Sequence, residues 1–263
     1  MRVGVVGAGG KMGREVCRMV AADPELELVA AVDPECTGEG AGGLAIVGEL
    51  DALVDGDAEV VVDFTRAAAA RTTLAWCAAH GIHAVVGTTG FDDRDLATLG
   101  DLFAGPDQRA PNCVLAANFA IGAVLMMRFA EIAAPWFDAA EIVELHHDGK
   151  LDAPSGTSLQ TAARMAAARV EAGADPYPAD ATTTVMVEGA RGGSGPGGVR
   201  MHSVRLTGLV AHQEVLLGSV GQSLTLRHDS YERTSFMAGV ALAIKAVASR
   251  PGLTVGLEPL LGL

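Results

Sequence analysis

Short apolar runs alternate with alanine-rich amphipathic stretches up to about residue 118. The apolar runs predict strands over Val3–Val6, Leu28–Val32, Val60–Phe64, Ala84–Val86 and Val114–Ala117. The stretches between several of them predict helices over Gly13–Ala22, Ala67–His80 and Asp93–Ala104. Because the runs are apolar at consecutive positions, both faces of the sheet must be covered, which is typical of parallel strands in an α/β domain.

The pattern changes after Asn118, where predicted strands follow one another with few helices between them. Helices are predicted over Ile121–Ala134, Thr157–Glu171 and Thr234–Ser249. Strands are predicted over Ala140–His147, Thr182–Glu188, Val199–Leu209, Glu214–Ser219 and Ser223–His228. This order favours a Rossmann-like, doubly wound parallel-sheet α/β domain at residues 1–118, and an α+β domain with a mixed or antiparallel sheet at residues 119–234. The segment from about 235 to 263 is predicted to pack back on the first domain.

Acidic residues outnumber basic ones, and this limits the partners of the chain. Asp and Glu total 32 against 19 Lys and Arg, so the formal net charge is −13 with neutral histidines. A surface of this charge repels polyphosphates and anionic lipids, which argues against nucleic-acid and membrane partners. An anionic ligand must therefore be bound by local positive groups or by helix N-termini.

Cysteine use and the chain start favour a cytoplasmic protein. The cysteines form no CxxC pair and are expected to be reduced. They are Cys17, Cys36, Cys77 and Cys113. The first residues lead directly into an apolar strand, without the layout of a secretory signal. The longest apolar run, Cys113 to Met127, is interrupted by Asn118 and is shorter than the ~20 residues of a membrane span.

A glycine-rich turn follows the first strand and begins the first helix. Its sequence is Gly7-Ala8-Gly9-Gly10-Lys11-Met12-Gly13. Such a turn lets the backbone approach a pyrophosphate, which the N–H groups of the helix N-terminus can bind. Asp33 ends the second strand, where its carboxylate can accept hydrogen bonds from both ribose hydroxyls of an adenosine. Together these features predict a dinucleotide site, although a glycine turn alone also occurs as a tight connection.

The residue after Asp33 bears on the choice of dinucleotide. Pro34 offers no basic side chain to a 2′-phosphate, so NADH is favoured. Lys11 lies in the glycine turn and can reach a 2′-phosphate, so use of NADPH, or of both, stays open.

Further predicted strands end in small or polar residues. These ends are Asp63-Phe64-Thr65, Gly87-Thr88-Thr89-Gly90 and Ala116-Ala117-Asn118-Phe119. In open α/β sheets, ligands bind at the carboxyl ends of the strands. The three segments are therefore candidates for contacts with ribose and nicotinamide, while Gly87–Gly90 taken alone is equally well explained as a turn.

The segment Glu144–Thr157 holds the most specific cluster of polar residues. His146 and His147 end a predicted strand, so their side chains face opposite sides. The Asp-Gly pair that follows predicts a turn, which brings Lys150 back towards His146. Ser155-Gly156-Thr157 begins a helix whose N–H groups can bind a carboxylate. An imidazole, an ammonium and a helix start together indicate a site for a small dicarboxylate.

Other interpretations of this segment remain open. Paired histidines can bind zinc, but no third ligand stands at a familiar metal spacing and lysine is not a usual zinc ligand, so no metal is expected. Each side chain taken singly also suits a plain strand end, a solvated loop charge or a simple helix cap.

The segment Glu144–Thr157 resembles the signature of the 4-hydroxy-tetrahydrodipicolinate reductase family, also called the dihydrodipicolinate reductase family. The resemblance extends over nearly the whole chain. It includes the glycine turn with Asp33, the strand ends described above, and the later pairs Val204-Arg205 and Arg227-His228. It implies NAD(P)H-dependent reduction of 4-hydroxy-tetrahydrodipicolinate to tetrahydrodipicolinate and water, in diaminopimelate and lysine biosynthesis.

The resemblance also implies roles for individual residues. His146 would be the general acid, with an ordinary pKa of about 6.5, and Lys150 would stabilise or protonate the developing anion. The substrate carboxylates would contact His147, Gly156 and Thr157. The cofactor would contact Gly7, Ala8, Gly9, Gly10, Lys11, Met12, Asp33, Gly87, Thr88, Thr89, Ala116, Ala117, Asn118 and Phe119. Family members are commonly homotetramers built through the C-terminal sheet, so residues 119–234 are expected to bind substrate and form the oligomer.

One stretch departs from the family pattern, and two other function classes remain. Many relatives have Gly-Glu-His after Leu209-Val210, whereas this chain has Ala211-His212-Gln213, and the contribution of that loop stays open. A nicotinamide oxidoreductase acting on a semialdehyde or an amino acid would share the first domain. A non-catalytic cofactor-binding regulator would tolerate the loss of His146 and Lys150.

Overall fold

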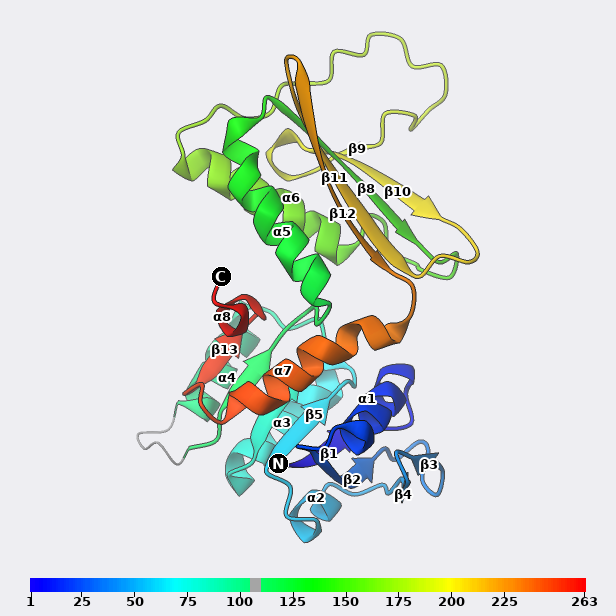
Figure 1. Ribbon diagram of the computed structural model, residues 1–263, viewed down its shortest axis with the longest axis vertical. Helices are drawn as coiled ribbons and strands as arrows, with labels where there is room; N and C mark the ends of the chain where they lie inside the picture. The colour runs from blue at the N-terminus through cyan, green and yellow to red at the C-terminus, as the bar shows by residue number, and fades with distance from the viewer. Residues whose placement is uncertain (105–109) are drawn as a thin grey trace. The chain divides into compact units, whose positions relative to one another are not determined.

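The computed structural model describes residues 1–104 and 110–263, which form two compact units (Figure 1). Unit 1 comprises Met1–Ile121 and Arg233–Leu263, and unit 2 comprises Gly122–Glu232. Within the described ranges, unit 1 contains a six-stranded sheet and unit 2 a five-stranded sheet. The predicted fold class, a Rossmann-like parallel sheet followed by an α+β arrangement with a mixed sheet, is confirmed.

The large sheet of unit 1 is parallel throughout, in the order β13-β7-β6-β5-β1-β2. Its strands are β1 (Arg2–Val6), β2 (Glu27–Val32), β5 (Val60–Asp63), β6 (His83–Val86), β7 (Cys113–Leu115) and β13 (Leu253–Val255). Every residue of β5 and β7 is buried, as expected for strands covered on both faces. Only β13 was not predicted, because three residues carry too little pattern to recognise.

The helices of unit 1 lie in two layers. They are α1 (Lys11–Ala22), α2 (Asp51–Asp55), α3 (Ala67–His80), α4 (Asp93–Phe103), α7 (Met237–Val247) and α8 (Glu258–Leu261). Helix α1 packs against α7, and α3 packs against α4. Right-handed crossovers that leave β1 and β5 in opposite directions along the sheet place α1 and α3 on opposite faces. A small hairpin, β3 (Gly40–Ala41) with β4 (Leu44–Ala45), follows β2.

Asn112, just before β7, binds the C-terminal segment of unit 1. Its side-chain amide donates to the carbonyl oxygens of Val247 (3.0 Å) and Ala248 (3.1 Å), and its Oδ1 accepts from the N–H of Gly252 (3.0 Å). The side chain is buried, so these bonds are shielded from water. They join the end of α7 and the start of β13 to the sheet.

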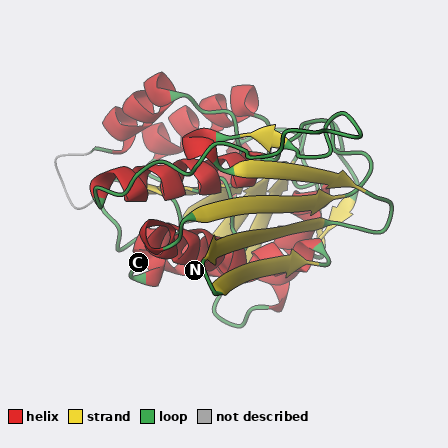
Figure 2. Ribbon diagram, turned by 90° about the horizontal axis from the view of Figure 1, so that it is seen from above, coloured by secondary structure: helices red, strands yellow, loops and turns green. Residues whose placement is uncertain are grey.

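The sheet of unit 2 is mixed, in the order β12-β11-β8-β10-β9. Its strands are β8 (Ala139–His146), β9 (Gly193–Ser194), β10 (Arg200–Arg205), β11 (Ala211–Ser219) and β12 (Gln222–Ser230). Strand β8 is parallel to β10 and antiparallel to β11. Figure 2 shows these strands side by side in one layer.

Two long helices, α5 (Ile121–Ala133) and α6 (Gly156–Glu171), lie on one face of this sheet (Figure 1). Alternate strand residues make up that face, because side chains of a strand point to opposite sides in turn. Its centre is apolar and buried, with Ile142 from β8 and Val215 and Leu217 from β11. Short 3₁₀ turns cover Ala134–Trp136 and Pro196–Gly198 in unit 2, and Arg233–Phe236 in unit 1.

The strand predicted over Thr182–Glu188 is wrong. Among the described residues this segment has no partner strand, and its apolar side chains Val185, Met186 and Val187 are 55%, 88% and 68% exposed. The edge of the sheet beside β10 is occupied by β9 instead. A β-branched run forms a strand only where another strand pairs with it, and local sequence does not specify that partner.

Candidate functional site

The carboxyl ends of the strands in unit 1 lie at one edge of the sheet. Val6 is in register with Asp63, Asp63 with Val86, and Val86 with Leu115. The predicted cofactor segments after β1, β6 and β7 therefore begin at the same level of the sheet. The chain leaves β1 and β5 towards opposite faces, which makes this the topological switch point where α/β sheets bind ligands.

The glycine turn begins α1 and leaves the helix N-terminus without a side-chain cap. Gly7 has a φ of +79°, a conformation that glycine adopts without steric cost. Gly10 is the N-cap residue and has no side chain, so it cannot cap the N–H groups of the first turn. Gly13 packs directly on the turn, where a Cβ atom would lie 2.0 Å from the carbonyl oxygen of Gly7. A helix start of this form can bind a pyrophosphate.

Some residues of the glycine turn are buried in the core of unit 1, and others are accessible at its surface. The N–H groups of Gly7 and Ala8 donate to the carbonyl oxygen of Val32 (2.9 and 3.1 Å), and Ala8 is fully buried. These two residues therefore attach the turn to β2. Gly10 and Lys11 are exposed, and the neighbouring Gly9 and Met12 are half-buried.

Asp33 follows β2 and lies beside the glycine turn. Its Oδ2 accepts from the N–H of Gly9 (3.0 Å), and its Oδ1 accepts from the N–H of Glu35 (3.0 Å). The half-buried carboxylate keeps part of its surface for ribose hydroxyls. Arg14 does not add free positive charge here, because its guanidinium binds Glu39 and the carbonyl oxygen of Gly9.

Asp63 joins two of the loops at the sheet edge. Its side chain is 1% exposed, and Oδ1 accepts from the N–H (2.8 Å) and the hydroxyl (2.7 Å) of Thr65 and from the hydroxyl of Thr88 (3.2 Å). Burial raises the pKa of the Asp63 carboxyl, and these donors oppose the rise. Thr88 is itself buried, so chiefly its backbone is available to a ligand, whereas Thr89 is exposed.

The segment Ala116–Phe119 after β7 also contains both buried and accessible residues. Ala116 and Phe119 are buried, and the Phe119 ring lies 5.6 Å from the ring of Phe64. Ala117 is exposed and Asn118 is half-buried. These two residues are therefore the members of the segment that a ligand can reach.

The edge of unit 1 fits a nicotinamide dinucleotide. The uncapped start of α1 suits the pyrophosphate, and the Asp33 carboxylate suits the adenosine ribose. The ribose and nicotinamide at the other end would meet the loops after β6 and β7. The residues with accessible groups are Gly9, Gly10, Lys11, Met12, Asp33, Gly87, Thr89, Ala117 and Asn118.

In unit 2, His146 ends β8 and bonds through Nδ1 to the carboxylate of Glu144. The two residues stand two apart on one strand, so they share a face of the sheet. Glu144 is fully buried and accepts two hydrogen bonds from Arg205, from Nη1 to Oε2 and from Nη2 to Oε1, both at 2.9 Å. Arg205 on β10 is in register with His146.

Burial and the neighbouring charges shift the pKa values of Glu144 and His146. Burial raises the pKa of the Glu144 carboxyl, but hydrogen bonds from Arg205, Ser203 and His146 outweigh it and leave the pKa below its ordinary value. Burial lowers the pKa of His146, Glu144 opposes this, and Lys150 and Arg205 add to the lowering. The pKa of His146 therefore lies below the ordinary value expected from the sequence. A bound anion beside the ring would raise it.

The turn predicted after β8 is confirmed, because the N–H of Lys150 donates to the carbonyl oxygen of His147 (3.2 Å). The ammonium of Lys150 donates to both carboxylate oxygens of Asp152 (2.7 and 2.9 Å). The carbonyl oxygen of Asp152 accepts from Arg205 at 2.5 Å. The loop that carries Lys150 is thus attached to the arginine that binds Glu144, while His147 is exposed beyond the strand.

Helix α6 begins with free backbone donors. Ser155 is its N-cap residue, and the Ser155 hydroxyl accepts from the N–H of Ser158 (3.2 Å). The N–H groups of Gly156 and Thr157 have no partner within the helix, since first-turn donors lack one. The dipole of this 16-residue helix also favours an anion at its start.

Gln213 of β11 attaches the start of α6 to the sheet. Its Oε1 accepts from the hydroxyl of Ser158 (2.7 Å), and its Nε2 donates to the hydroxyl of Thr161 (2.9 Å). Gln213 is also the cross-strand neighbour of Glu144. His146 lies two positions further along β8 and is therefore the next residue on the same face. The helix start and His146 therefore occupy neighbouring positions on one face of unit 2.

The sequence by itself assigned no role to Glu144, Arg205 or Gln213, and it indicated Asp63 only as part of a strand end that could contact the cofactor. One signal was available: Glu144 stands two residues before His146 in a predicted strand, and therefore on the same face. No local signal joins Arg205 to Glu144, which are 61 positions apart, or Gln213 to Ser158, which are 55 apart. Those contacts depend on which strands pair.

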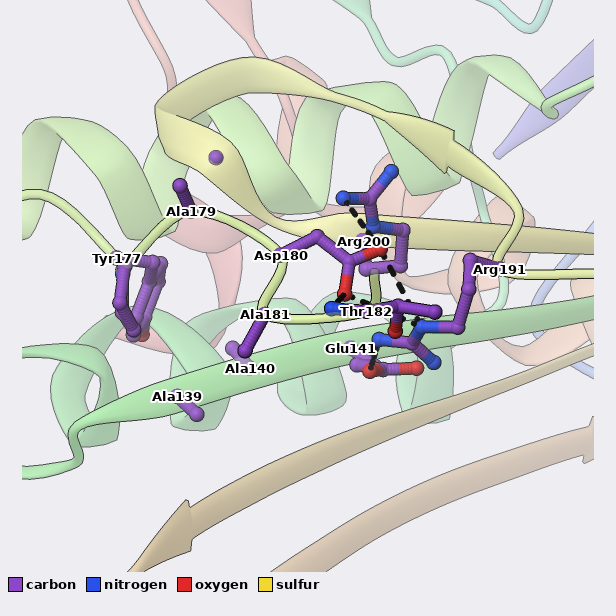
Figure 3. Close-up of a pocket in the computed structure, with 12 residues that line it drawn as sticks. Ala139, Ala140, Glu141, Tyr177, Ala179, Asp180, Ala181, Thr182, Arg191 and Arg200 are labelled. Carbon is purple, nitrogen blue, oxygen red and sulfur yellow. Dashed lines mark hydrogen bonds and ion pairs between the residues drawn. The ribbon is translucent and has the colours of Figure 1, made fainter. Parts of the chain in front are cut away.

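A separate cavity of about 450 Å³ lies at the other end of β8, lined by Glu141, Asp180, Arg191 and Arg200 among others (Figure 3). Its charges are paired. Arg191 contacts Glu141 (2.7 Å) and Asp180 (3.4 Å), and Arg200 contacts Asp180 (3.2 Å). No residue predicted for the site lines this cavity, so it is not the candidate site.

In residues 1–104 and 110–263, no group of three or more His, Cys, Asp or Glu side chains is placed to hold a metal ion. No helix in those same ranges combines the length and the apolar character needed to cross a membrane. The four cysteines are all free.

Comparison with known proteins covers almost the entire chain. The family profile described as dihydrodipicolinate reductase, N-terminus, matches residues 1–119, and the profile for the C-terminus matches residues 122–261. The chain is 51% identical over 263 residues to the 4-hydroxy-tetrahydrodipicolinate reductase of Cutibacterium acnes, covering 100% of this chain and 99% of that protein. It is 52% identical over 264 residues to the enzyme of the same name from Nocardia farcinica, with the same coverage.

A solved structure agrees with these sequence matches. The dipicolinate-bound dihydrodipicolinate reductase from Paenisporosarcina sp. TG-14 superimposes with a TM-score of 0.85 and 39% identity, covering 98% of each chain. Identity near one half along the full length, together with both family profiles and this shared fold, decides the relationship. The chain belongs to the dihydrodipicolinate reductase family.

Proposed function

We propose that this chain reduces 4-hydroxy-tetrahydrodipicolinate to tetrahydrodipicolinate and water with NAD(P)H, a step of diaminopimelate and lysine biosynthesis. The observation that carries the proposal is the cluster on one face of unit 2. It comprises His146, the loop of Lys150 and the start of α6, joined through Glu144, Arg205 and Gln213. Relatives about half identical to the chain bear the name of this activity.

The residues of unit 2 have distinct tasks in this reaction. The N–H groups of Gly156 and Thr157, with His147, bind a substrate carboxylate at the start of α6. A bound nicotinamide supplies a hydride, with its electron pair, to the ring of the unsaturated imine that remains after loss of water. His146 donates the proton that completes the reduction, and the Lys150 ammonium stabilises the charge that develops on the ring.

The charges near Asp33 support a preference for NADH. A 2′-phosphate would add negative charge beside this carboxylate, and the Arg14 guanidinium is already paired with Glu39. Like charges at this spacing disfavour the phosphate. Lys11 is exposed in the glycine turn, so binding of NADPH with lower affinity remains part of the proposal.

The variant Asp33→Ala is expected to weaken NADH binding roughly tenfold or more, because hydrogen bonds to a charged acceptor contribute about 1.5–3 kcal/mol each. NADPH binding should change less, since the substitution also removes a repulsive charge. Fluorescence titration of both dinucleotides measures the two affinities. Glu35→Ala is the matched control, because it removes a neighbouring negative charge but no proposed ribose contact. Equal losses for NADH and NADPH would exclude Asp33 from the ribose site.

The proposed assembly is a homotetramer in the cytoplasm, formed through unit 2. Unit 2 exposes apolar side chains that a partner subunit can cover, among them Val185, Met186, Val187, Leu206 and Val220. Four free cysteines, most of them buried, are typical of a reducing compartment.

A coupled assay tests the activity directly. The substrate is made in situ from pyruvate and aspartate semialdehyde by the preceding synthase. Oxidation of NADH and of NADPH is followed separately by the loss of the near-ultraviolet absorbance of the reduced nicotinamide. We expect oxidation that depends on the synthase and on both of its substrates. Oxidation of either dinucleotide with simple aldehydes, but none with the coupled substrate, would instead favour another nicotinamide oxidoreductase.

A further inference from the structure

We propose that Glu144, held by Arg205, is a positioning residue that keeps a proton on Nδ1 of His146, so that the proton given to the substrate is the one on Nε2. The inference deepens the proposed function and rests on it, because it takes His146 as the proton donor. It concerns residues to which neither the family resemblance nor the comparisons assign a role.

The contacts of Glu144 leave its carboxylate one orientation. It is fully buried on β8, and both oxygens accept from the guanidinium of Arg205 at 2.9 Å. Arg205 is fixed in turn, since it donates to the carbonyl oxygens of Val204 (2.8 Å) and Asp152 (2.5 Å). A carboxylate held in this way presents a fixed acceptor to Nδ1 of His146.

A carboxylate without a proton can only accept at Nδ1. The pKa of Glu144 lies below its ordinary value, because the hydrogen bonds from Arg205, Ser203 and His146 outweigh the effect of burial. Nδ1 of His146 must therefore carry a hydrogen whether the ring is neutral or protonated. The proton that leaves the imidazolium is then the one on Nε2.

The proton balance of the step follows from this tautomer. The imidazolium of His146 loses its Nε2 proton and becomes the neutral ring with hydrogen on Nδ1. The substrate gains that proton, and it gains a hydride with two electrons from the reduced nicotinamide, which is oxidised. Water returns a proton to Nε2 before the next turnover.

The charged groups around His146 come from three elements. Glu144 lies on its own strand, Arg205 on β10, and Lys150 in the following turn, where Asp152 pairs with it. Strand β11 places Ala211 opposite His146 and adds no charge. Glu144 is thus the negative group in direct contact with the ring, and it opposes the effects of burial and of the two cations.

The same strand contains a matched pair that serves as a control. Glu141 also binds an arginine and a histidine. It accepts from Arg191 at 2.7 Å (Figure 3) and bonds to Nε2 of His202 at 2.7 Å. It stands three positions from Glu144, so it lies on the opposite face of the sheet. Its substitution removes the same kind of network away from His146.

The first experiment compares Glu144→Gln with Glu141→Gln. In Glu144→Gln the amide oxygen turns to Arg205 and the amide N–H₂ faces Nδ1, which disfavours the imidazolium. We expect kcat to fall at least about tenfold, as other carboxylate–histidine pairs lose activity on neutralisation. The alkaline limb of kcat/KM should move about one pH unit or more to lower pH, as for removal of an adjacent opposite charge. Glu141→Gln should retain the wild-type profile.

A second measurement uses the wild-type chain and does not depend on the folding of a variant. In ¹⁵N-histidine NMR, neutral His146 should show a protonated Nδ1 and an unprotonated Nε2, with its signals identified by their loss in His146→Gln. A protonated Nε2 in neutral His146 would overturn the proposal. So would a folded Glu144→Gln, with normal thermal unfolding and NADH binding, that keeps wild-type kcat and pH profile.

The two proposals can fail separately. If the wild-type chain does not reduce the coupled substrate, the proposed function fails, whatever the tautomer. If the wild-type chain is active but His146 is protonated on Nε2 when neutral, the positioning role of Glu144 fails and the function stands.

Discussion

Replacing both His146 and Lys150 with alanine is expected to lower kcat roughly 10³-fold or more, while NADH binding is retained. A general acid contributes about 10²–10⁴-fold, and a charged group that stabilises a developing anion contributes about 10²–10³-fold. The two losses are not expected to multiply, because both groups act on the same charge. In the proposed function NADH binds to residues of unit 1, and both substitutions lie in unit 2. Steady-state assays and fluorescence titration measure the two quantities.

His202→Ala provides the matched control for this result. His202 belongs to the same sheet and bonds to a glutamate, as His146 does, but its partner is Glu141. Its loss should leave kcat close to the wild-type value. Near-normal turnover in the double variant would contradict the assigned chemistry, and an equal loss in His202→Ala would indicate general damage to the sheet.

The pH dependence of the wild-type chain tests the same acid. His146 must be protonated to act, so kcat/KM should fall as pH rises through its pKa in the free protein. Burial lowers the pKa of His146, with Lys150 and Arg205 adding to the effect, which places this limb below about pH 6.5. The limb in kcat should lie at higher pH, because the bound dicarboxylate favours the imidazolium. The reverse order of the two limbs would argue against His146.

Gly13→Ala is expected to disrupt the start of α1 and with it the binding of either dinucleotide. The added Cβ would lie 2.0 Å from the carbonyl oxygen and 2.7 Å from the carbonyl carbon of Gly7. Both atoms belong to the backbone of the turn, so the helix must move away from it. Overpacking costs about 1–3 kcal/mol in a folded protein. We expect the loss of stability to lie at the upper end of that range. NADH binding should weaken at least about tenfold, which corresponds to a loss of about 1.4 kcal/mol of binding free energy.

Gly100→Ala separates this effect from the general cost of changing a helical glycine. Gly100 lies within α4, and a Cβ there would meet no atom within 4 Å. The substitution should raise the free energy of unfolding by about 0.5–1 kcal/mol, because alanine is a better helix former than glycine. Denaturant unfolding and NADH titration of both variants complete the comparison. Unchanged NADH binding in Gly13→Ala would exclude the turn as the pyrophosphate site.

The first five strands of the large sheet of unit 1, and the longer helices of that unit, were predictable because each depends on nearby residues. A run such as Val60–Phe64 is apolar at successive positions, and the glycine turn places small residues where strand and helix must meet closely. The same locality explains the turn that carries Lys150, since an Asp-Gly pair bends the chain whatever lies around it. The residues quoted for the candidate site were likewise read from continuous segments.

The elements that were wrong or missed depend on distant partners. Thr182–Glu188 has the composition of a strand but no strand beside it among the described residues, whereas β9 and β13 are too short to recognise and form because neighbouring strands bind them. Backbone groups of a strand require hydrogen-bond partners that lie elsewhere in the chain. Composition alone therefore cannot decide such cases.

Local sequence was sufficient to predict the fold class, the order of most of the longer strands and helices, and the set of groups available for anion and cofactor binding, because periodicity and turn residues act over a few positions. Which of these groups act on one another depends on how the strands pair in three dimensions. The register of β8 with β10 and β11 brings Arg205 to Glu144 and Gln213 to the start of α6. Burial and these contacts then set the pKa of His146, since a charge responds to every group near it in space rather than along the chain.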